Sequence, residues 1–358
     1  MTHASCTVFY TPLFLEHKTT PMHPESPRRL RVCVEELRRS GVCPSDSCTV
    51  ESPRRAGEEE VALAHSRAYI NHVRRVSESG GGFLDGDTPV SAETYEAAMH
   101  AAGAVLEACE RALREGGFKA FCLVRPPGHH AGFDGIALTA PTRGFCVFNN
   151  LAIGVKWLLR QGVERILVFD HDCHHGNGTQ EILYSDRVLK IDMHQDPRTI
   201  YPGSGFVDEI GSGDGRGYMV NIPLPVASGD DLCETALEEV VKPLVWQFKP
   251  QIMLVSAGFD PHREEPITRL SFTANAFSWI YDLLVEASEA FCEGRMVATL
   301  EGGYGPFLGN LVTLAVSKMA GVEYGFEEPE SKSPSWAVEE FRRTLNRLRD
   351  VLSPYWDL

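Results

Sequence analysis

The stretch VFDHDCHHGNGTQ, residues 168–180, decides how this chain is interpreted. It follows an apolar run, residues 166–169, and holds five ionisable side chains within six positions: Asp170, His171, Asp172, His174 and His175. The pattern is typical of a buried strand that delivers polar side chains to its carboxyl end, where open α/β sheets bind ligands. Because these groups would repel and desolvate one another without a cation, the stretch predicts a metal site. The alternative is a polar turn whose acids cap the next helix.

Three side chains form the expected metal ligand set. In an extended D-x-H segment, Asp172 and His174 point to the same side and can share an ion. Asp260 follows another apolar run, residues 252–256, which ends in AGFD. Two carboxylates and one imidazole leave positions for water and substrate, as in catalytic metal sites. The set suits Zn²⁺, Fe²⁺ or Mn²⁺, and the sequence does not choose among them.

The composition excludes several classes of protein. With 43% hydrophobic and 23% charged residues, the chain of 358 residues is an ordinary globular protein. A formal charge of −15 and the lack of a long Lys/Arg cluster argue against nucleic-acid binding. Without a leader peptide or a long apolar segment, we expect a cytoplasmic protein that does not enter membranes. The ten cysteines lack a C-x-x-C pair, which predicts reduced thiols and no disulfide framework.

Apolar runs alternate with helical patterns along the chain. Strands are expected at residues 7–10, 118–124, 166–169, 188–193, 218–222, 252–256 and 296–300. Helices are expected at residues 28–40, 60–76, 91–115, 145–159, 231–248, 274–292 and 336–352. Residues 43–60 and 80–89 are predicted as loops. The alternation predicts a mostly parallel sheet covered by helices on both faces.

The chain shows no break long enough to separate two domains. We therefore expect one catalytic domain over residues 1–358, with an acidic linker at residues 326–334 and a helix and tail at residues 335–358.

Two adjacent histidines, His129 and His130, follow a stiff turn made by Pro126, Pro127 and Gly128. They come just after a predicted strand, and carboxyl ends of parallel strands share one edge of a sheet, so they are expected near the metal. One of them can take a proton from water and give it to a leaving amine, while Asp170 or Asn177 orients the rings. The alternative is that backbone carbonyls simply satisfy both rings.

Three aromatic residues are expected around the same cleft. Tyr304, in a Gly-rich turn, can donate a hydrogen bond that stabilises an oxyanion, although alone it would more often be a packed turn residue. Phe145 and Tyr201 are candidates for the two walls of a narrow channel.

Nine motifs in order resemble the histone deacetylase and acetylpolyamine amidohydrolase superfamily across nearly the whole chain. They are HPESPRRL (23–30), DTPVSAETYEAA (87–98), RPPGHH (125–130), GFCVFNN (144–150), DHDCHHGNGTQ (170–180), HQDP (194–197), YPGSG (201–205), AGFD (257–260) and LEGGY (300–304). GNGTQ and LEGGY look most like class II and bacterial members. The resemblance implies an arginase-like three-layer α/β/α sandwich around a mostly parallel eight-stranded sheet, and zinc-dependent hydrolysis of N-acetyl amides.

The resemblance also implies a role for each site residue. Asp172, His174 and Asp260 fall on the zinc ligands, and His130 falls on the general base and acid. His129 is its electrostatic partner, and Tyr304 polarises the carbonyl.

The substrate channel is implied in the same way. Phe145 and Tyr201 match its walls, Gly144 lies at its inner wall, and Asp87 matches an acid at the rim that holds substrate backbone in some members. Ile267 falls on the gate position, where polyamine-selective members carry Glu.

Two positions depart from the family pattern. Asn177 stands where class I members have Asp, so His130 should be less basic. A structural potassium ion is also expected, near Asp170, Asp192 and Met193. Asp192 replaces a strand-end serine there, which either strengthens cation binding or marks an altered site.

The sequence therefore predicts an amide hydrolase that removes acetyl or short acyl groups from acyl-lysine. An enzyme for acetylpolyamines or other small N-acyl amines is the alternative. A non-catalytic acyl-binding protein should have lost a ligand or Tyr304, and a binuclear manganese enzyme would need further bridging carboxylates. The oligomeric state is not predicted.

Overall fold

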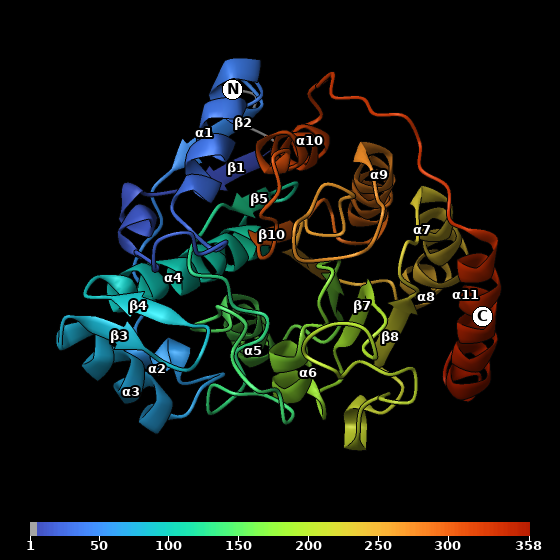
Figure 1. The fold of residues 1–358 in the computed structure, drawn as a ribbon, viewed down its shortest axis with the longest axis horizontal. Coiled ribbons are helices and arrows are strands. Elements are labelled where there is room, and N and C mark those ends of the chain that lie inside the picture. Colours follow the sequence, from blue (N-terminus) through green and yellow to red (C-terminus); the bar gives the residue numbers. More distant parts are fainter. Residues whose placement is uncertain (1–5) are drawn as a thin grey trace.

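An eight-stranded sheet forms the centre of the molecule (Figure 1). The computed structural model describes residues 6–358. The strand order is β2-β1-β5-β10-β9-β6-β7-β8, and each neighbouring pair is parallel. The strands are β1 Cys6–Phe9, β2 Cys48–Glu51, β5 Lys119–Cys122, β6 Ile166–Asp170, β7 Leu189–Gln195, β8 Met219–Leu224, β9 Ile252–Ala257 and β10 Met296–Leu300. Every strand except β2 is buried along its whole length, as expected for a sheet covered on both faces.

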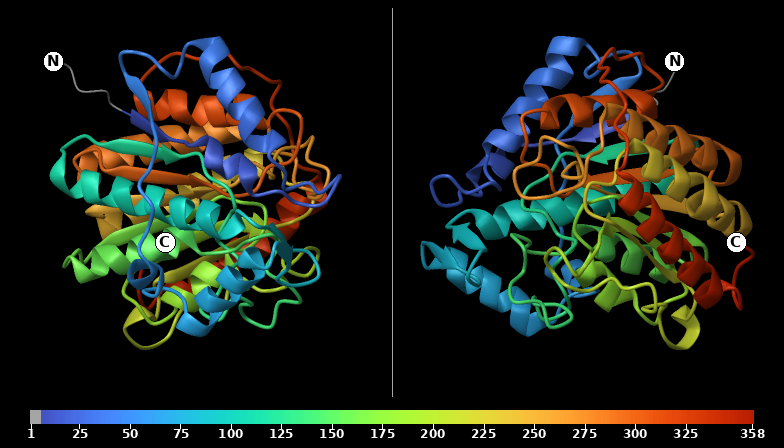
Figure 2. Two further views of the ribbon diagram at one scale, coloured as in Figure 1. Left: turned by 90° about the vertical axis from the view of Figure 1, so that its left-hand side faces the viewer. Right: turned by 45° about the vertical axis from the view of Figure 1, so that its right-hand side comes forward.

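Helices cover both faces of the sheet (Figure 2). One layer contains α1 Arg28–Ser40, α9 Ala274–Phe291 and α10 Leu308–Ala320, and the other contains α4 Thr94–Arg114 and α5 Asn150–Arg160. Beyond α9 lie α7 Asp230–Ala236 and α8 Lys242–Phe248, joined by a π-helical turn Leu237–Val241, and α11 Ser335–Leu352 packs beside β8 (Figure 1). The predicted α/β sandwich with a parallel eight-stranded sheet is confirmed.

Several elements were not predicted. They are β2, the hairpin of β3 Gly81–Phe83 and β4 Pro89–Ser91, α6 Asn177–Leu183, α10 and the 3₁₀ turns Pro12–Glu16 and Gly213–Gly215. The two predicted loops, residues 43–60 and 80–89, are therefore wrong in part. The hairpin has no hydrophobic pattern that would predict it, because three glycines stand at its start. At Gly81 a Cβ atom would lie 2.5 Å from the Val90 carbonyl oxygen.

Some predicted helices begin or divide elsewhere. The helix expected at residues 60–76 is two helices, α2 Glu58–Val61 and α3 Arg67–Glu78, because Ser66 caps α3 by accepting from the Tyr69 amide. The helix expected from residue 145 begins at Asn150. Asn149 caps it, and the positive φ of 71° at Phe145 is incompatible with a helix. The helix expected from residue 91 begins at Thr94, because Ser91 belongs to β4.

One cysteine prediction is also wrong. Cys43 and Cys48 form a disulfide, with their Cα atoms 5.1 Å apart. The turn between them, in which the Ser45 amide donates to the Cys48 carbonyl at 2.8 Å, brings the two ends together. The remaining cysteines are free and buried, as expected. Among residues 6–358, no helix has the length and apolar character needed to cross a membrane.

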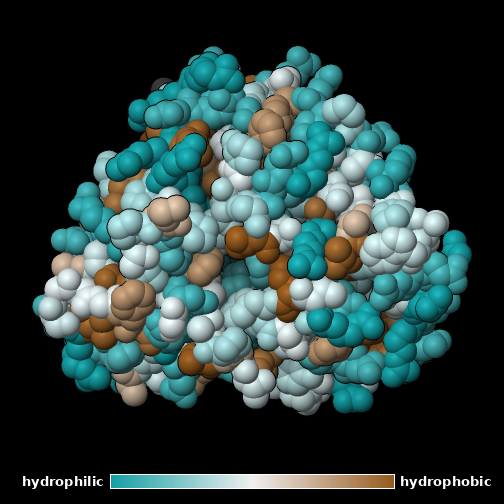
Figure 3. All heavy atoms as spheres, viewed as in Figure 1, coloured by the Kyte–Doolittle hydropathy of each residue, from teal (hydrophilic) through white to brown (hydrophobic). Residues whose placement is uncertain are grey.

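The strand order explains how distant residues meet. Strands β5, β10, β9 and β6 are direct neighbours, and their carboxyl ends lie at one edge because all pairs are parallel. The loops that follow them carry the histidine pair, Tyr304, Asp260 and the Asp172 segment. In the view of Figure 3 the surface is hollowed near its centre, and hydrophobic side chains gather around the hollow.

Candidate active site

Asp172, His174 and Asp260 converge as the sequence predicts. One ligand atom of each lies within 4.8 Å of the others, and all three residues are buried. His174 Nδ1 is 3.1 Å from Asp172 Oδ1 and 2.8 Å from Asp260 Oδ2. The second oxygen of each carboxylate is fixed by a backbone amide, from Gly302 to Asp172 at 2.7 Å and from Cys173 to Asp260 at 2.8 Å. Each acid therefore presents one oxygen toward the imidazole.

The route by which Asp172 and His174 meet differs from the expectation. Strand β6 ends at Asp170, so the D-x-H segment is a turn and not extended chain. Asp172 Oδ1 accepts from the His174 amide at 2.9 Å, and this local bond brings the two side chains together.

The ligand set fits a divalent cation. Although burial opposes protonation, the charges of Asp260 and Asp172 raise the pKa of His174 to about 10. Burial and the charge of Asp172 raise the pKa of Asp260. A buried site this negative binds protons or a metal, and two carboxylates with one imidazole suit Zn²⁺, Fe²⁺ or Mn²⁺.

A second group, His129, Cys146 and Glu301, also has converging ligand atoms. Burial raises the pKa of the Cys146 thiol well above its usual value, so the thiol stays protonated. Glu301 Oε2 already accepts the backbone amides of Gly128 at 2.7 Å and His129 at 3.1 Å. This group therefore fits a metal less well, and Glu301 instead holds the turn that carries the histidine pair.

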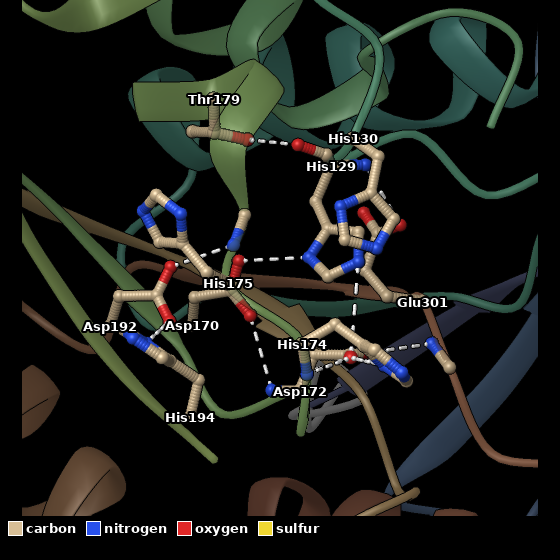
Figure 4. A network of polar contacts seen from close by, with 12 residues as sticks. His129, His130, Asp170, Asp172, His174, His175, Thr179, Asp192, His194 and Glu301 are labelled. Atoms are coloured by element: carbon tan, nitrogen blue, oxygen red, sulfur yellow. Dashed lines mark hydrogen bonds and ion pairs between the residues drawn. The ribbon is translucent and has the colours of Figure 1, made fainter. Parts of the chain in front are cut away.

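The two histidines have different partners, and Figure 4 shows Asp170 as that of His129. His129 Nδ1 lies 3.1 Å from Asp170 Oδ2, and His130 Nδ1 lies 2.7 Å from Asn177 Oδ1. The Asn177 side-chain NH₂ donates to the Ala137 carbonyl at 3.1 Å, so its oxygen must face His130 as an acceptor. His130 therefore carries its proton on Nδ1, and Nε2 is free to accept another.

Their electrostatic surroundings also differ. Burial lowers the pKa of His130 well below its usual value, and the charges of His129 and His174 lower it further. For His129 burial acts in the same direction, but the charges of Asp172 and Asp170 outweigh it and raise the pKa. The pair thus combines a neutral imidazole with a charged one, which suits proton transfer by His130.

Tyr304 lies on a loop held from two sides. The amides of Tyr304 and Gly305 donate to Glu265 Oε1 at 2.9 and 2.7 Å. Arg29 donates from Nε to the Gly303 carbonyl at 2.7 Å, and its guanidinium lies 4.8 Å from the Tyr304 ring centre. Burial raises the pKa of Tyr304 well above its usual value, although Arg29 opposes the change. The phenol therefore keeps its proton and can donate it in a hydrogen bond.

Aromatic rings surround the approach to these groups. The Tyr201 ring is perpendicular to that of His130 at 4.9 Å, and its hydroxyl donates to the Thr142 carbonyl at 2.8 Å. The Phe145 ring is perpendicular to that of Tyr304 at 5.9 Å. At Gly144 a Cβ atom would lie 2.6 Å from His130 and 2.9 Å from Tyr201, so no side chain can stand between the two rings.

Asp87 and Ile267, the residues predicted at the rim and the gate, have less direct contact with the site. Both oxygens of Asp87 accept hydrogen bonds, from Thr88 at 2.9 Å and Thr142 at 2.6 Å. The Thr142 carbonyl also accepts a hydrogen bond from the Tyr201 hydroxyl, so Asp87 lies beside Tyr201. Ile267 is 40% exposed, and the next residue, Thr268, donates to the Asp260 carbonyl. The loop that carries Ile267 is therefore tied to Asp260.

Comparisons with known proteins agree with the geometry of this site. A model of the histone deacetylase domain matches residues 23–319. The chain belongs to the histone deacetylase family. It is 39% identical to a "Probable deacetylase" of Archaeoglobus fulgidus over 96% of each chain. It is 33% identical to a "Histone deacetylase-like amidohydrolase" of Pseudomonas aeruginosa, over 93% of this chain and 87% of that protein.

A solved structure gives the same result. The crystal structure of the HDA15 HD domain matches with a TM-score of 0.87 and 30% identity, covering 99% of this chain and 95% of that one. The protein is thus a metal-dependent hydrolase of the histone deacetylase family, and acyl amines are its class of substrate.

Three residues that support this deacetylase site were not predicted from the sequence. Arg29 and Glu301 lie inside the motifs HPESPRRL and LEGGY, and those motifs were the signal that could have found them. Glu265 lies in no motif, and only the contact between its loop and the Tyr304 loop reveals its role.

Proposed function

We propose that this deacetylase is a zinc enzyme that removes acetyl or other short acyl groups from the side-chain amine of lysine. The observation that carries the proposal is the convergence of Asp172, His174 and Asp260 beside a neutral His130 and a protonated Tyr304. A metal-binding group, a proton acceptor and a hydrogen-bond donor are the parts that amide hydrolysis requires.

The side chains divide the chemistry among them. A divalent metal held by Asp172, His174 and Asp260 supplies Lewis-acid chemistry, which activates water and polarises the amide carbonyl. His130 Nε2 accepts the proton of the attacking water and later delivers it to the leaving amine. Tyr304 donates a hydrogen bond to the developing oxyanion.

A linear substrate fits the approach to the site. Phe145 and Tyr201 present aromatic surfaces that can enclose the methylene chain of an acylated lysine. Polyamines share such a chain, so acetylpolyamine hydrolysis is the second candidate, and the formal charge of −15 attracts polyamines as it attracts basic peptides. Ile267 is apolar and offers no charge to a second ammonium, whereas both oxygens of Asp87 already accept hydrogen bonds from Thr88 and Thr142. A non-catalytic protein is the weakest reading, because every expected ligand and Tyr304 are present.

The test is acetate release from an acetyl-lysine peptide by the purified protein and by Tyr304→Phe. We expect a chelator to abolish the activity and Zn²⁺ to restore it. Tyr304→Phe should retain its metal and lose kcat by about 10²–10³-fold, the usual cost of removing one oxyanion donor. Tyr324→Phe, which removes a hydroxyl bonded to Glu36 far from the site, is the matched control. A Tyr304→Phe enzyme with the kcat of the native protein would contradict the mechanism.

A further inference from the structure

Two buried carboxylates lie directly opposite each other behind the active site. In the parallel pair of β6 and β7, Asp170 is in register with Asp192, and both side chains are fully buried. A Cβ atom at Gly176 would lie 2.4 Å from Asp170 Oδ2 and 3.3 Å from Asp192 Oδ2, so both oxygens face one point. Like charges repel strongly in a low-dielectric interior, and this arrangement needs a cation.

Lys190 provides that cation from the same strand. It lies two residues before Asp192, so both side chains project from one face of β7. Its side chain is 1% exposed, and its ammonium contacts Asp192 Oδ2. Buried lysines are rare unless they are paired. Burial and the charge of Asp192 raise the pKa of Asp170, and the charges of His129 and Lys190 oppose that rise.

The residues do not fit the potassium ion that the family resemblance led us to expect here. Asp192 Oδ2 accepts from the Lys190 ammonium and, at 2.9 Å, from the Gly176 amide. Asp192 Oδ1 lies 2.7 Å from Nδ1 of His194. Hydrogen-bond donors thus surround the carboxylate that was expected to bind the ion, whereas a hard cation needs oxygen ligands with free lone pairs. The side chain of Met193 is buried in the core.

We propose that Lys190 is a built-in cation that takes the place of a structural potassium ion and positions the catalytic histidine pair. Figure 4 shows Asp170 between Asp192 and His129. Asp170 Oδ2 faces His129 Nδ1 at 3.1 Å, and Asp170 Oδ1 accepts the amide of the metal ligand Asp172 at 3.1 Å. Lys190 therefore acts through Asp170 on both the proton-transfer pair and the metal turn.

The first test uses the native protein in potassium, sodium and choline chloride at equal ionic strength. We expect the same thermal unfolding midpoint and the same kcat in all three salts, because the protein carries its own cation. A midpoint or kcat that rises specifically with K⁺ would overturn the proposal. This measurement needs no variant.

The second test removes the ammonium. Lys190→Ala should lower the unfolding midpoint and reduce kcat by roughly 10–100-fold in choline chloride, the usual effect of losing a supporting group behind a metal site. Methylammonium or K⁺ should restore part of both losses, whereas Lys190→Arg should retain most of the activity without added cation. If Lys190→Ala in choline chloride matched the native protein in both measurements, Lys190 would not be the required cation.

A double variant separates charge from packing. Lys190→Ala/Asp192→Ala lacks both the ammonium and its partner, so its unfolding midpoint should not respond to K⁺ or methylammonium. A response equal to that of Lys190→Ala would overturn the assignment of Asp192 as the partner. The kcat measurements rest on the proposed function, but thermal unfolding does not. Failure to deacetylate lysine, with the expected unfolding pattern, would reject the proposed function alone.

Discussion

Asp170 and Asp172 show how two acids only two residues apart acquire different tasks. Both are fully buried, and Asp170 Oδ1 accepts the amide of Asp172. Asp170 ends strand β6 and turns its other oxygen toward His129, whereas Asp172 lies in the following turn and faces His174. The change from strand to turn between them therefore separates the acid that faces His129 from the proposed metal ligand.

This division predicts different metal contents for two matched variants. Asp172→Asn removes a charged ligand and leaves too few to hold the ion, so the purified variant should contain little zinc. Asp170→Asn changes a carboxylate of equal burial that does not face His174, and it should retain its zinc while losing turnover. Elemental analysis of both proteins measures the difference. A full equivalent of zinc in Asp172→Asn would remove Asp172 from the ligand set.

At the scale of elements, loops from neighbouring strands support one another. The loop after β9 carries Asp260, Glu265 and Ile267, and the loop after β10 carries Tyr304. Glu265 joins them, because its carboxylate accepts the amides of Tyr304 and Gly305. The position of Tyr304 therefore depends on Glu265, in the loop that carries Asp260, as well as on its own strand.

We expect Glu265→Gln to loosen the Tyr304 loop. Both oxygens of Glu265 face the Tyr304 amide at 2.9 Å, whereas glutamine offers one oxygen and would place its NH₂ donor against that amide. The expected result is a kcat lower by about tenfold, or ~1.4 kcal/mol of transition-state stabilisation, with the bound metal retained.

The neighbouring Glu264→Gln removes the same charge from an exposed residue and is the control. Steady-state kinetics on an acetyl-lysine peptide distinguishes the two. Equal kcat values for both variants and the native enzyme would show that Glu265 does not position Tyr304.

Elements with strong local patterns were predictable from the sequence. The limits of α1 and β10 agree with the prediction, because α1 has a clear apolar stripe and a terminal Gly41 with positive φ, and β10 is a continuous apolar run. Strand β2 has one buried residue, Cys48, followed by three residues that are partly or fully exposed, and no pattern distinguishes it from a loop. It becomes a strand only because β1 offers it a partner.

The same limit applies to the site. Residues at the ends of the predicted strands were identifiable, because parallel strands bring those ends to one edge. Lys190 and Glu265 were not, since their importance depends on which residue lies opposite them. Asp170 meets Asp192 through the register of β6 and β7, and Glu265 meets Tyr304 through the packing of two loops. A local sequence pattern indicates neither of these contacts.

At the scale of the whole molecule, an approach flanked by the rings of Phe145 and Tyr201 lies on an acidic protein. The net charge of −15 attracts cationic substrates of every kind, so it raises encounter with basic peptides and polyamines alike. Selection between peptides and polyamines must therefore come from residues near the entrance to the site. A polyamine presents a second ammonium where a peptide presents its backbone, and Ile267 offers that ammonium only apolar contact.

We therefore expect the enzyme to cleave acetyl-lysine peptides with a higher kcat/KM than acetylspermidine. Ile267→Glu places a carboxylate on the gate loop, where it can pair with the second ammonium of a polyamine. The ratio of kcat/KM for the acetyl-lysine peptide to kcat/KM for acetylspermidine should therefore fall by about tenfold, or ~1.4 kcal/mol, which narrows or reverses the preference. Val50→Glu adds the same charge on the edge strand β2 and should leave the ratio unchanged, because a change in net charge affects both substrates alike. A native enzyme that already prefers acetylspermidine would exclude Ile267 as the selector and direct attention to the acidic hairpin connection at Asp85 and Asp87.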